Sequence, residues 1–422
     1  MKRHLRFFAT LILLILLTAL AYVNWKLYDT PELRVVEGDT INYDLLCQLR
    51  HLRDAMANNA ANDMQNIYPE GYVFFNALYG LAWTDFASSL NRKSILFQEA
   101  HVEMQRAYNN IASEHARSSF DESLPLPYGA FYTGWSTYLL GRKLEAELPG
   151  QRAQDELEKF IKSCELISSK LRSQTYPASY YGSAWPADAM MCAAALATHD
   201  RLFSPRYSGS LRMWISNVRV LTEGNGLIPH RVHSITGKVV EPGRGSSQGL
   251  MLCLLTEIDR DFAHEQFVIY QALFLDTRLG LPGILEFPTD ESGESDIDSG
   301  PVVWGIGGAA TITGMRTMMG YGKRETAHAL RNTIEALSFP NMDDGKKKYF
   351  LGKQPMADAF IAWSHASIKR PWNANSNAPW RRKFQILSLI FSLPSVALIL
   401  WMWREKLRIK ATDGKEKIRL RI

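Results

Sequence analysis

The strongest constraint on the fold is a repeat of two kinds of helical segment along the middle of the chain. The first kind is amphipathic, with apolar residues recurring every three or four positions and Glu, Lys and Ser between them, as residues 152–173 illustrate. Segments of this kind cover residues 41–63, 92–117, 152–173, 207–222, 259–279 and 323–338. Such a stripe predicts a helix with one buried face and one face in water.

Each amphipathic segment is followed by a second kind, which opens with Pro, Gly and aromatic residues and then runs apolar on all sides. These segments begin at Tyr68, Leu126, Tyr180, Pro242, Asp296 and Met356, at spacings of 58, 54, 62, 54 and 60 residues. A helix that is apolar all round is buried all round. Six such pairs predict an all-α fold, an (α/α)6 toroid of six helical hairpins whose inner ring is the buried set. Only residues 227–242 indicate a β-hairpin, turning at Thr236-Gly237.

The helix openings, such as YPEGYVFF from Tyr68 and YYGSAWPADA from Tyr180, give the chain a likeness to known families. Over residues 40–368 it resembles the six-hairpin glycosidase superfamily, whose members are glycoside hydrolases, polysaccharide lyases and sugar epimerases. The same toroid occurs in linalool dehydratase/isomerase, a lyase of terpenoid alcohols. The resemblance lies in architecture and loop texture, so it implies a fold and a class of enzyme and assigns no catalytic residue.

Two uncharged apolar stretches flank this repeat. Residues 7–23 and 384–403 are 17 and 20 residues long, enough to cross a hydrocarbon layer as a helix. Pro394 is compatible with a membrane span, and Trp401 and Trp403 suit an interfacial belt. For the first stretch a cleaved signal peptide is the alternative, because Ala19-Leu20-Ala21 fits a cleavage site.

Charge orients the two predicted spans. Three Lys/Arg precede the first and eight follow the second, which predicts that residues 1–6 and 404–422 are cytoplasmic tails at the inner membrane. Residues 30–375 then form an exported domain. The tail contributes +5 and the first six residues +3 to a total of +5, which leaves −3 for residues 7–403. This acidic body argues against nucleic-acid binding.

In alternating hairpins all inner helices point the same way, so their opening loops meet at one mouth of the ring. Acids and aromatic rings there suit carbohydrate chemistry, with a pair of carboxylates to protonate a leaving oxygen and activate water. The candidate catalytic residues are Asp188 and Asp298, then Glu70, Glu286 and Asp296. The candidate substrate-binding residues are Arg244, Tyr128, Tyr181, Trp185, Trp304 and His365.

Several of these candidates have a structural alternative. Asp188 follows Pro186 and suits the first turn of a helix for dipole reasons. Asp296 and Asp298 precede Ser-Gly-Pro and suit a helix cap. Arg244, between glycines in PGRGSSQG, suits an anionic ligand or a neighbouring acid.

No metal or cofactor is predicted. His230 and His233 have alternating spacing and no third ligand nearby. The acidic run EFPTDESGESDID is a solvated loop, with a calcium site near Asp290 to Asp298 as the alternative. The four cysteines fall at apolar helix positions and are expected to be buried free thiols.

Together these features predict a membrane-anchored, exported enzyme acting on a saccharide or glycoconjugate, and Arg244 favours an anionic one. The alternatives are a non-catalytic glycan-binding or assembly subunit and a lyase of an apolar alcohol. The lyase would need an apolar cavity, and a thiol of Cys192 or Cys253 facing that cavity would be a further indication.

Overall fold

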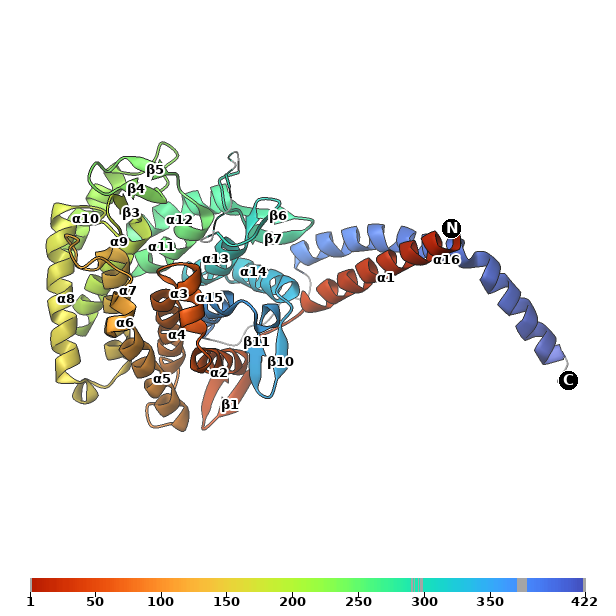
Figure 1. The fold of residues 1–422 in the computed structure, drawn as a ribbon, viewed down its shortest axis with the longest axis horizontal. Coiled ribbons are helices and arrows are strands. Elements are labelled where there is room, and N and C mark those ends of the chain that lie inside the picture. Colours follow the sequence, from red (N-terminus) through yellow and green to blue (C-terminus); the bar gives the residue numbers. More distant parts are fainter. Residues whose placement is uncertain are drawn as a thin grey trace.

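The computed structural model describes residues 2–289, 291, 293, 294, 296, 299–369 and 378–419, and among these the side chains of residues 4–404. The segments predicted to be buried form the helices α4 (Gly71–Ala87), α7 (Gly129–Ala146), α9 (Pro186–Leu202), α11 (Gly245–Ile258), α13 (Gly308–Gly320) and α15 (Pro355–His365). Consecutive members of this set pack against one another, and α15 packs against both α13 and α4. The inner helices therefore form a closed ring (Figure 1).

The amphipathic segments form an outer layer. They are α2 (Tyr43–Ala57), α5 (Ile95–Ile111), α8 (Gln154–Ser173), α10 (Ser208–Val220), α12 (Arg260–Phe274) and α14 (Arg324–Leu337). Helix α5 packs on α4, α8 on α7 and α9, α12 on α11, α14 on α13 and α2 on α15. The short helices α3 (Ala60–Ile67) and α6 (Glu114–Arg117) lie in the connections, as do the 3-10 turns Pro149–Gln151 and Phe350–Gly352. The predicted arrangement of outer and inner helices is thus confirmed for the described residues.

Local sequence explains where several helices begin. The side chains of Ser94 and Asp259 accept hydrogen bonds from backbone N–H groups in the first turns of α5 and α12. Pro186 and Pro355 are the first residues of α9 and α15, a position where the missing N–H of proline costs nothing.

Short antiparallel hairpins decorate the loops. Strands β1 (Leu33–Val36) and β2 (Asp39–Asn42) pair, as do β6 (Leu275–Arg278) with β7 (Leu281–Ile284), β8 (Val302–Val303) with β9 (Ile306–Gly307), and β10 (Asn341–Asp343) with β11 (Lys346–Lys348). The predicted hairpin in residues 227–242 is present as β4 (Arg231–His233) and β5 (Val239–Glu241). It is joined by β3 (Ser183–Ala184) to make a three-stranded sheet. Neither β3 nor the four other hairpins were predicted from the sequence.

Glycines at the openings of the inner helices allow other backbone segments to approach closely. Gly129 has a φ of +78°, and a Cβ there would lie 2.2 Å from the carbonyl oxygen of Ser179. A Cβ on Gly245 would lie 1.9 Å from the carbonyl oxygen of Leu285. At these two positions the backbone of the helix opening is therefore in direct contact with the backbone of a neighbouring loop, and a side chain would not fit between them.

We expect Gly245→Ala to destabilise the protein by about 1–3 kcal/mol, because the backbone of Leu285 would have to move. Gly209→Ala is the matched control, since a Cβ there meets nothing within 4 Å and alanine favours the helix. Denaturant unfolding of both variants in detergent measures the difference. If the two variants have equal stability, the close fit at α11 is not a constraint on the fold.

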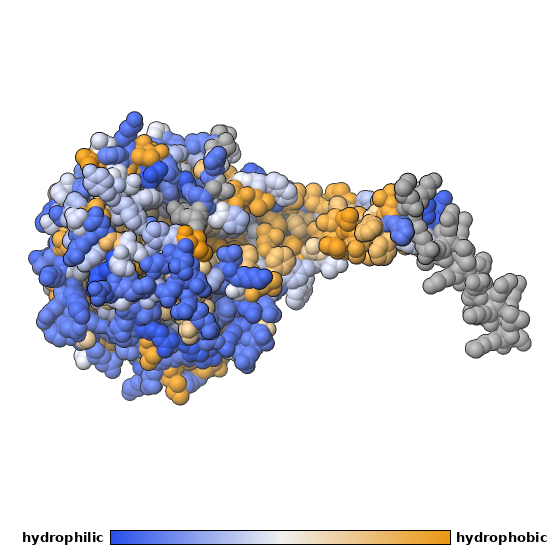
Figure 2. Space-filling model, viewed as in Figure 1, coloured by the Kyte–Doolittle hydropathy of each residue, from blue (hydrophilic) through white to orange (hydrophobic). Residues whose placement is uncertain are grey.

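Two long apolar helices form a stalk beside the ring. Helix α1 (Lys2–Lys26) and the proline-containing α16 (Pro379–Arg419) pack against each other and project from the body (Figure 1). Segments His4–Lys26 and Pro379–Arg404 are long and apolar enough to cross a membrane. Their mean hydropathy over an 18-residue window is 2.3 and 2.1. Figure 2 shows the stalk as an apolar rod attached to a largely hydrophilic body.

Polar contacts fix the pairing of the stalk helices. The Asn24 side chain donates to the Ser388 hydroxyl at 3.1 Å, near the body, and the Trp403 indole donates to the Thr10 hydroxyl at 2.9 Å, near the far end. The helices are therefore antiparallel, and residue 4 and residue 404 lie towards the same end of the stalk.

A buried charge cluster connects the ring to the root of the stalk, by which we mean the end of α1 and the start of α16 where they join the body. The Arg331 side chain on α14 is 1% exposed and donates to the carboxylate of Asp29, just after α1, at 3.0 Å. It also contacts Glu335 at 3.3 Å and Asp44 on α2 at 3.5 Å, while Lys347 contacts the same Glu335 at 3.0 Å. The chain leaving α1 is thus held by α2, α14 and β11 together.

Candidate functional site

A cavity of about 160 Å³ opens at the mouth of the ring, where the inner helices begin. Residues from the opening or first turns of all six inner helices line it, together with three residues from the connecting loops and sheet. The lining residues are Tyr68, Glu70, Phe74, Phe131, Trp135, Tyr180, Trp185, Ala187, Asp188, His230, Ser246, Ser247, Leu250, Ala309, Thr313, Met356 and Phe360. The predicted convergence of the six openings at one site is present in the structure.

Two of the candidate catalytic carboxylates, Glu70 and Asp188, line this cavity. Adjacent residues of one segment hold both of them. The Ser179 hydroxyl donates to Asp188 Oδ2 at 2.5 Å, and the Tyr180 hydroxyl donates to Glu70 Oε1. The same segment is fixed by a backbone bridge between Tyr180 and Ser183, so the orientations of the two carboxylates are linked.

His230 also lines the cavity, a position that the sequence did not predict. It is 6% exposed, and its Nδ1 has no hydrogen-bond partner among the described residues. Burial and the neighbouring Arg244 lower the pKa of its imidazole to about 4. His230 is therefore neutral at pH 7 and lines the cavity as an uncharged polar residue.

Glu286 lies one layer behind the cavity wall. Its side chain is fully buried and accepts a hydrogen bond from the Ser246 hydroxyl at 2.6 Å, and Ser246 lines the cavity. Burial raises the pKa of Glu286 to about 7. This candidate therefore meets the cavity through Ser246 and has no direct place in its wall.

The raised pKa of Glu286 has a consequence for stability. A carboxyl group that holds its proton more tightly in the folded chain loses stabilisation as pH rises from its ordinary value near 4.5 to about 7. That difference corresponds to about 3 kcal/mol. Glu286→Gln removes this loss, so we expect the variant to gain up to this amount relative to the wild type between pH 4.5 and pH 8.

Denaturant unfolding at the two pH values measures the effect, with the exposed Glu291→Gln as control. A stability difference between Glu286→Gln and the wild type that does not change with pH would mean that Glu286 titrates normally.

Arg244 is paired with acids at the rim of the site. Its guanidinium donates to Asp296 and to Glu241. Asp296 is itself half-exposed and accepts a backbone hydrogen bond from Ser299. The pairing with a neighbouring acid, which was the structural alternative for Arg244, is therefore present, and binding of an anionic ligand stays a prediction.

Of the four aromatic residues predicted to bind substrate, one lines the cavity and three do not. Trp185 lines the cavity, with Tyr180 edge-on to it at a centroid separation of 6.0 Å. Tyr181 and Trp304 are 87% and 67% exposed and do not line the cavity, and neither does Tyr128.

His365 lies at the C-terminal end of α15, away from the mouth. It is buried, and its Nδ1 lies 3.1 Å from the Gln48 amide nitrogen, which also donates to the Tyr349 hydroxyl. His365 is therefore a buried, hydrogen-bonded histidine and is not part of the mouth cavity.

Asp298 and Asp290 lie outside the described residues, so the structure does not place them. Within the described ranges, no group of three or more His, Cys, Asp or Glu side chains is arranged to hold a metal ion. The calcium hypothesis for Asp290 to Asp298 stays a prediction. The four cysteines are free thiols as expected, three buried and Cys253 half-buried, and neither Cys192 nor Cys253 lines the mouth cavity.

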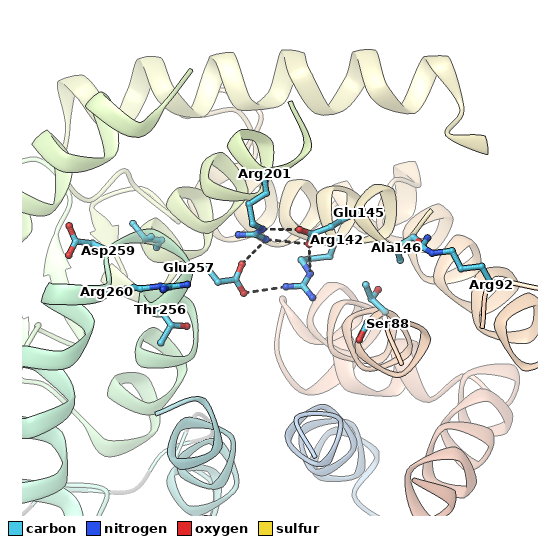
Figure 3. Close-up of a pocket in the computed structure, with 12 residues that line it drawn as sticks. Ser88, Arg92, Arg142, Glu145, Ala146, Arg201, Thr256, Glu257, Asp259 and Arg260 are labelled. Carbon is cyan, nitrogen blue, oxygen red and sulfur yellow. Dashed lines mark hydrogen bonds and ion pairs between the residues drawn. The ribbon is translucent and has the colours of Figure 1, made fainter. Parts of the chain in front are cut away.

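The opposite end of the ring has a different chemistry (Figure 3). A larger cavity of about 610 Å³ there contains Arg142, Glu145, Arg201 and Glu257, from the last turns of the inner helices α7, α9 and α11. Arg142 contacts Glu145 and Glu257 at 3.3 Å and Asp85 at 3.1 Å, and Arg201 contacts Glu145 at 2.8 Å and Glu257 at 2.9 Å. The arginines therefore pair with these acids, and their positive charge suits the C-terminal ends of the helices.

No family model matches this sequence, and a comparison with curated proteins finds no match. Among solved structures, the chain is similar to an unsaturated glucuronyl hydrolase (UGL) variant described with dGlcA-Glc-Rha-Glc. The identity is 10% and the TM-score 0.44, over 70% of this chain and 85% of that one. A likeness at this level does not identify a function.

Proposed function

We propose that this chain is a membrane-anchored glycoside hydrolase that binds one terminal sugar ring in the mouth cavity, with Glu70 and Asp188 as its acid and base. The observation that carries the proposal is the meeting of these two carboxylates with aromatic side chains in a cavity at the helix openings. One carboxyl would protonate the glycosidic oxygen and the other would activate water.

The size of the cavity supports a single ring. A cavity of about 150 Å³ accommodates benzene, so 160 Å³ gives room for one six-membered ring. Trp185 supplies an aromatic ring in the wall, and His230, Ser246 and Ser247 supply polar groups for sugar hydroxyls. A longer saccharide would have to extend out through the mouth.

Anchoring rests on the stalk. Helices α1 and α16 have the length and hydropathy of membrane spans, and they pair as an antiparallel hairpin. The excess of Lys and Arg beyond residue 403 and before residue 7 favours a cytoplasmic location for both ends, which would place the ring outside the cytoplasm.

A panel of aryl glycosides and reducing oligosaccharides, incubated with the full chain in detergent, tests the proposal. We expect release of one terminal sugar from at least one substrate, with a second product one residue shorter. Binding of a saccharide without turnover would support the non-catalytic glycan-binding alternative instead.

One observation favours a second candidate, a lyase of an apolar alcohol. Much of the cavity wall is apolar: Phe74 packs against Phe131, Trp135 and Phe360 at centroid separations of 4.8–5.7 Å. Dehydration of a terpenoid alcohol by the full chain, with no activity on the glycoside panel, would favour this candidate.

A further inference from the structure

Two hairpins beside the stalk carry apolar side chains at their tips. The two-residue turn between β6 and β7 is Leu279-Gly280, and that between β8 and β9 is Trp304-Gly305. Leu279 and Trp304 are 56% and 67% exposed. A single exposed apolar residue is ordinary, but apolar side chains that gather on one part of the surface mark an interaction site.

The backbone of these turns makes the choice of residue more unusual. Both Leu279 and Trp304 have a φ of +52°, in the left-handed region, where Asn, Asp and Gly are preferred in such hairpins. The other two hairpins with two-residue turns in the described chain have polar tips in the same conformation, Glu37 and Asp344. The chain thus places apolar residues at two strained tips and polar residues at two comparable ones.

Contacts place the apolar tips at the root of the stalk. A Cβ on Gly280 would lie 2.5 Å from the backbone nitrogen of Phe384, so the β6–β7 turn lies against α16. The β8–β9 turn is joined to it, since the Arg278 guanidinium donates to the Trp304 carbonyl at 3.0 Å. Figure 1 shows the β6–β7 hairpin extending towards the stalk.

The end of the stalk that joins the body, near Phe384, also carries the residues expected at a membrane surface. Trp25 and Tyr28, at and just beyond the end of α1, are 67% and 48% exposed, and Trp380 begins α16 beside the basic residues 381–383. Trp and Tyr gather where a span leaves the hydrocarbon layer. Phe339, 58% exposed, stacks on Tyr22 of α1 at 5.9 Å and extends this set of residues onto the body.

We propose that Leu279, Trp304 and Phe339 insert into the headgroup region of the membrane that the stalk crosses. This inference rests on the anchoring in the proposed function. It fixes the ring relative to the bilayer, because the spans and the tips contact the membrane together.

The consequence concerns the substrate. The Gly305 carbonyl next to the Trp304 tip accepts a hydrogen bond from Glu286 N at 2.9 Å, and β9 leads directly into α13 at the mouth. One side of the mouth would therefore lie at the membrane surface, which favours saccharides carried on membrane lipids as the substrate class.

The test uses the full chain reconstituted in phospholipid vesicles. Single cysteines replace Trp304, Leu279, Trp25 or Glu37 in a Cys253→Ala background and carry an environment-sensitive fluorophore. Glu37 is the matched control, because it is a tip with the same turn geometry, and β1 lies away from the stalk (Figure 1). Lipids with a spin label on the headgroup serve as the quencher.

We expect several-fold quenching at positions 304, 279 and 25, and none at position 37. Quenching at position 25 with none at 304 and 279 would overturn this inference and leave the membrane anchor standing. Absence of quenching at position 25 would overturn the anchor itself, and this inference with it.

Discussion

Asp188→Asn is expected to lower the turnover of the cleaved glycoside by about 10²–10⁴-fold, the usual contribution of a general acid or base. The substitution keeps the shape of the side chain and an oxygen that can accept from the Ser179 hydroxyl, so the fold is expected to stay intact. Glu70→Gln should have a comparable effect, because its oxygen can still accept from the Tyr180 hydroxyl. Initial rates at saturating substrate measure both.

Glu291→Gln is the control for these variants, since it changes an exposed carboxylate outside the cavity lining. Its turnover should equal that of the wild type. If Asp188→Asn and Glu70→Gln also retain full turnover, the acid and base are not in the mouth cavity.

Arg331→Met is expected to destabilise the protein by about 3–5 kcal/mol, because it leaves the buried carboxylates of Glu335 and Asp44 with Lys347 as their shared cation. It also removes the contact between Asp29 and α14 and leaves Asp29 paired with Lys26 alone. Denaturant unfolding in detergent, followed by circular dichroism, measures the change.

The control lies on the same helix. Arg324 is exposed, so Arg324→Met should change stability by less than about 0.5 kcal/mol. The double variant Arg331→Met with Glu335→Gln should recover part of the loss, since it leaves Lys347 to pair with Asp44 alone. Equal stability of the two single variants would show that the cluster does not hold the stalk root.

The ring could be predicted from the sequence because two periodic signals agree in it. Helices apolar on all sides must be buried, and their alternation with amphipathic helices at a period near 58 residues leaves few arrangements. Glu70 and Asp188 could be found for the same reason, since they stand at helix openings and all openings meet at one end.

The rest of the site depends on contacts that periodicity does not encode. His230 reaches the cavity through the sheet in which Ser183 pairs with His233, fifty positions later in the chain. Tyr180 and Tyr181 are neighbours in sequence, yet one lines the cavity and the other is exposed, because a single turn decides their directions.

The prediction of His365 as a substrate-binding residue was wrong for a simpler reason, its position along the helix. It is the last residue of α15, about ten residues and therefore about 15 Å from the helix opening. The ring geometry itself, applied residue by residue, would have placed it far from the mouth.

A crystal structure of the Asp188→Asn variant, soaked with the saccharide that the wild type cleaves, tests the proposed site most directly. We expect one sugar ring in the mouth cavity beside Trp185, with the glycosidic oxygen about 2.6–3.2 Å from the side chain at position 188 or from Glu70. A saccharide bound elsewhere on the ring, with the mouth cavity unoccupied, would contradict it.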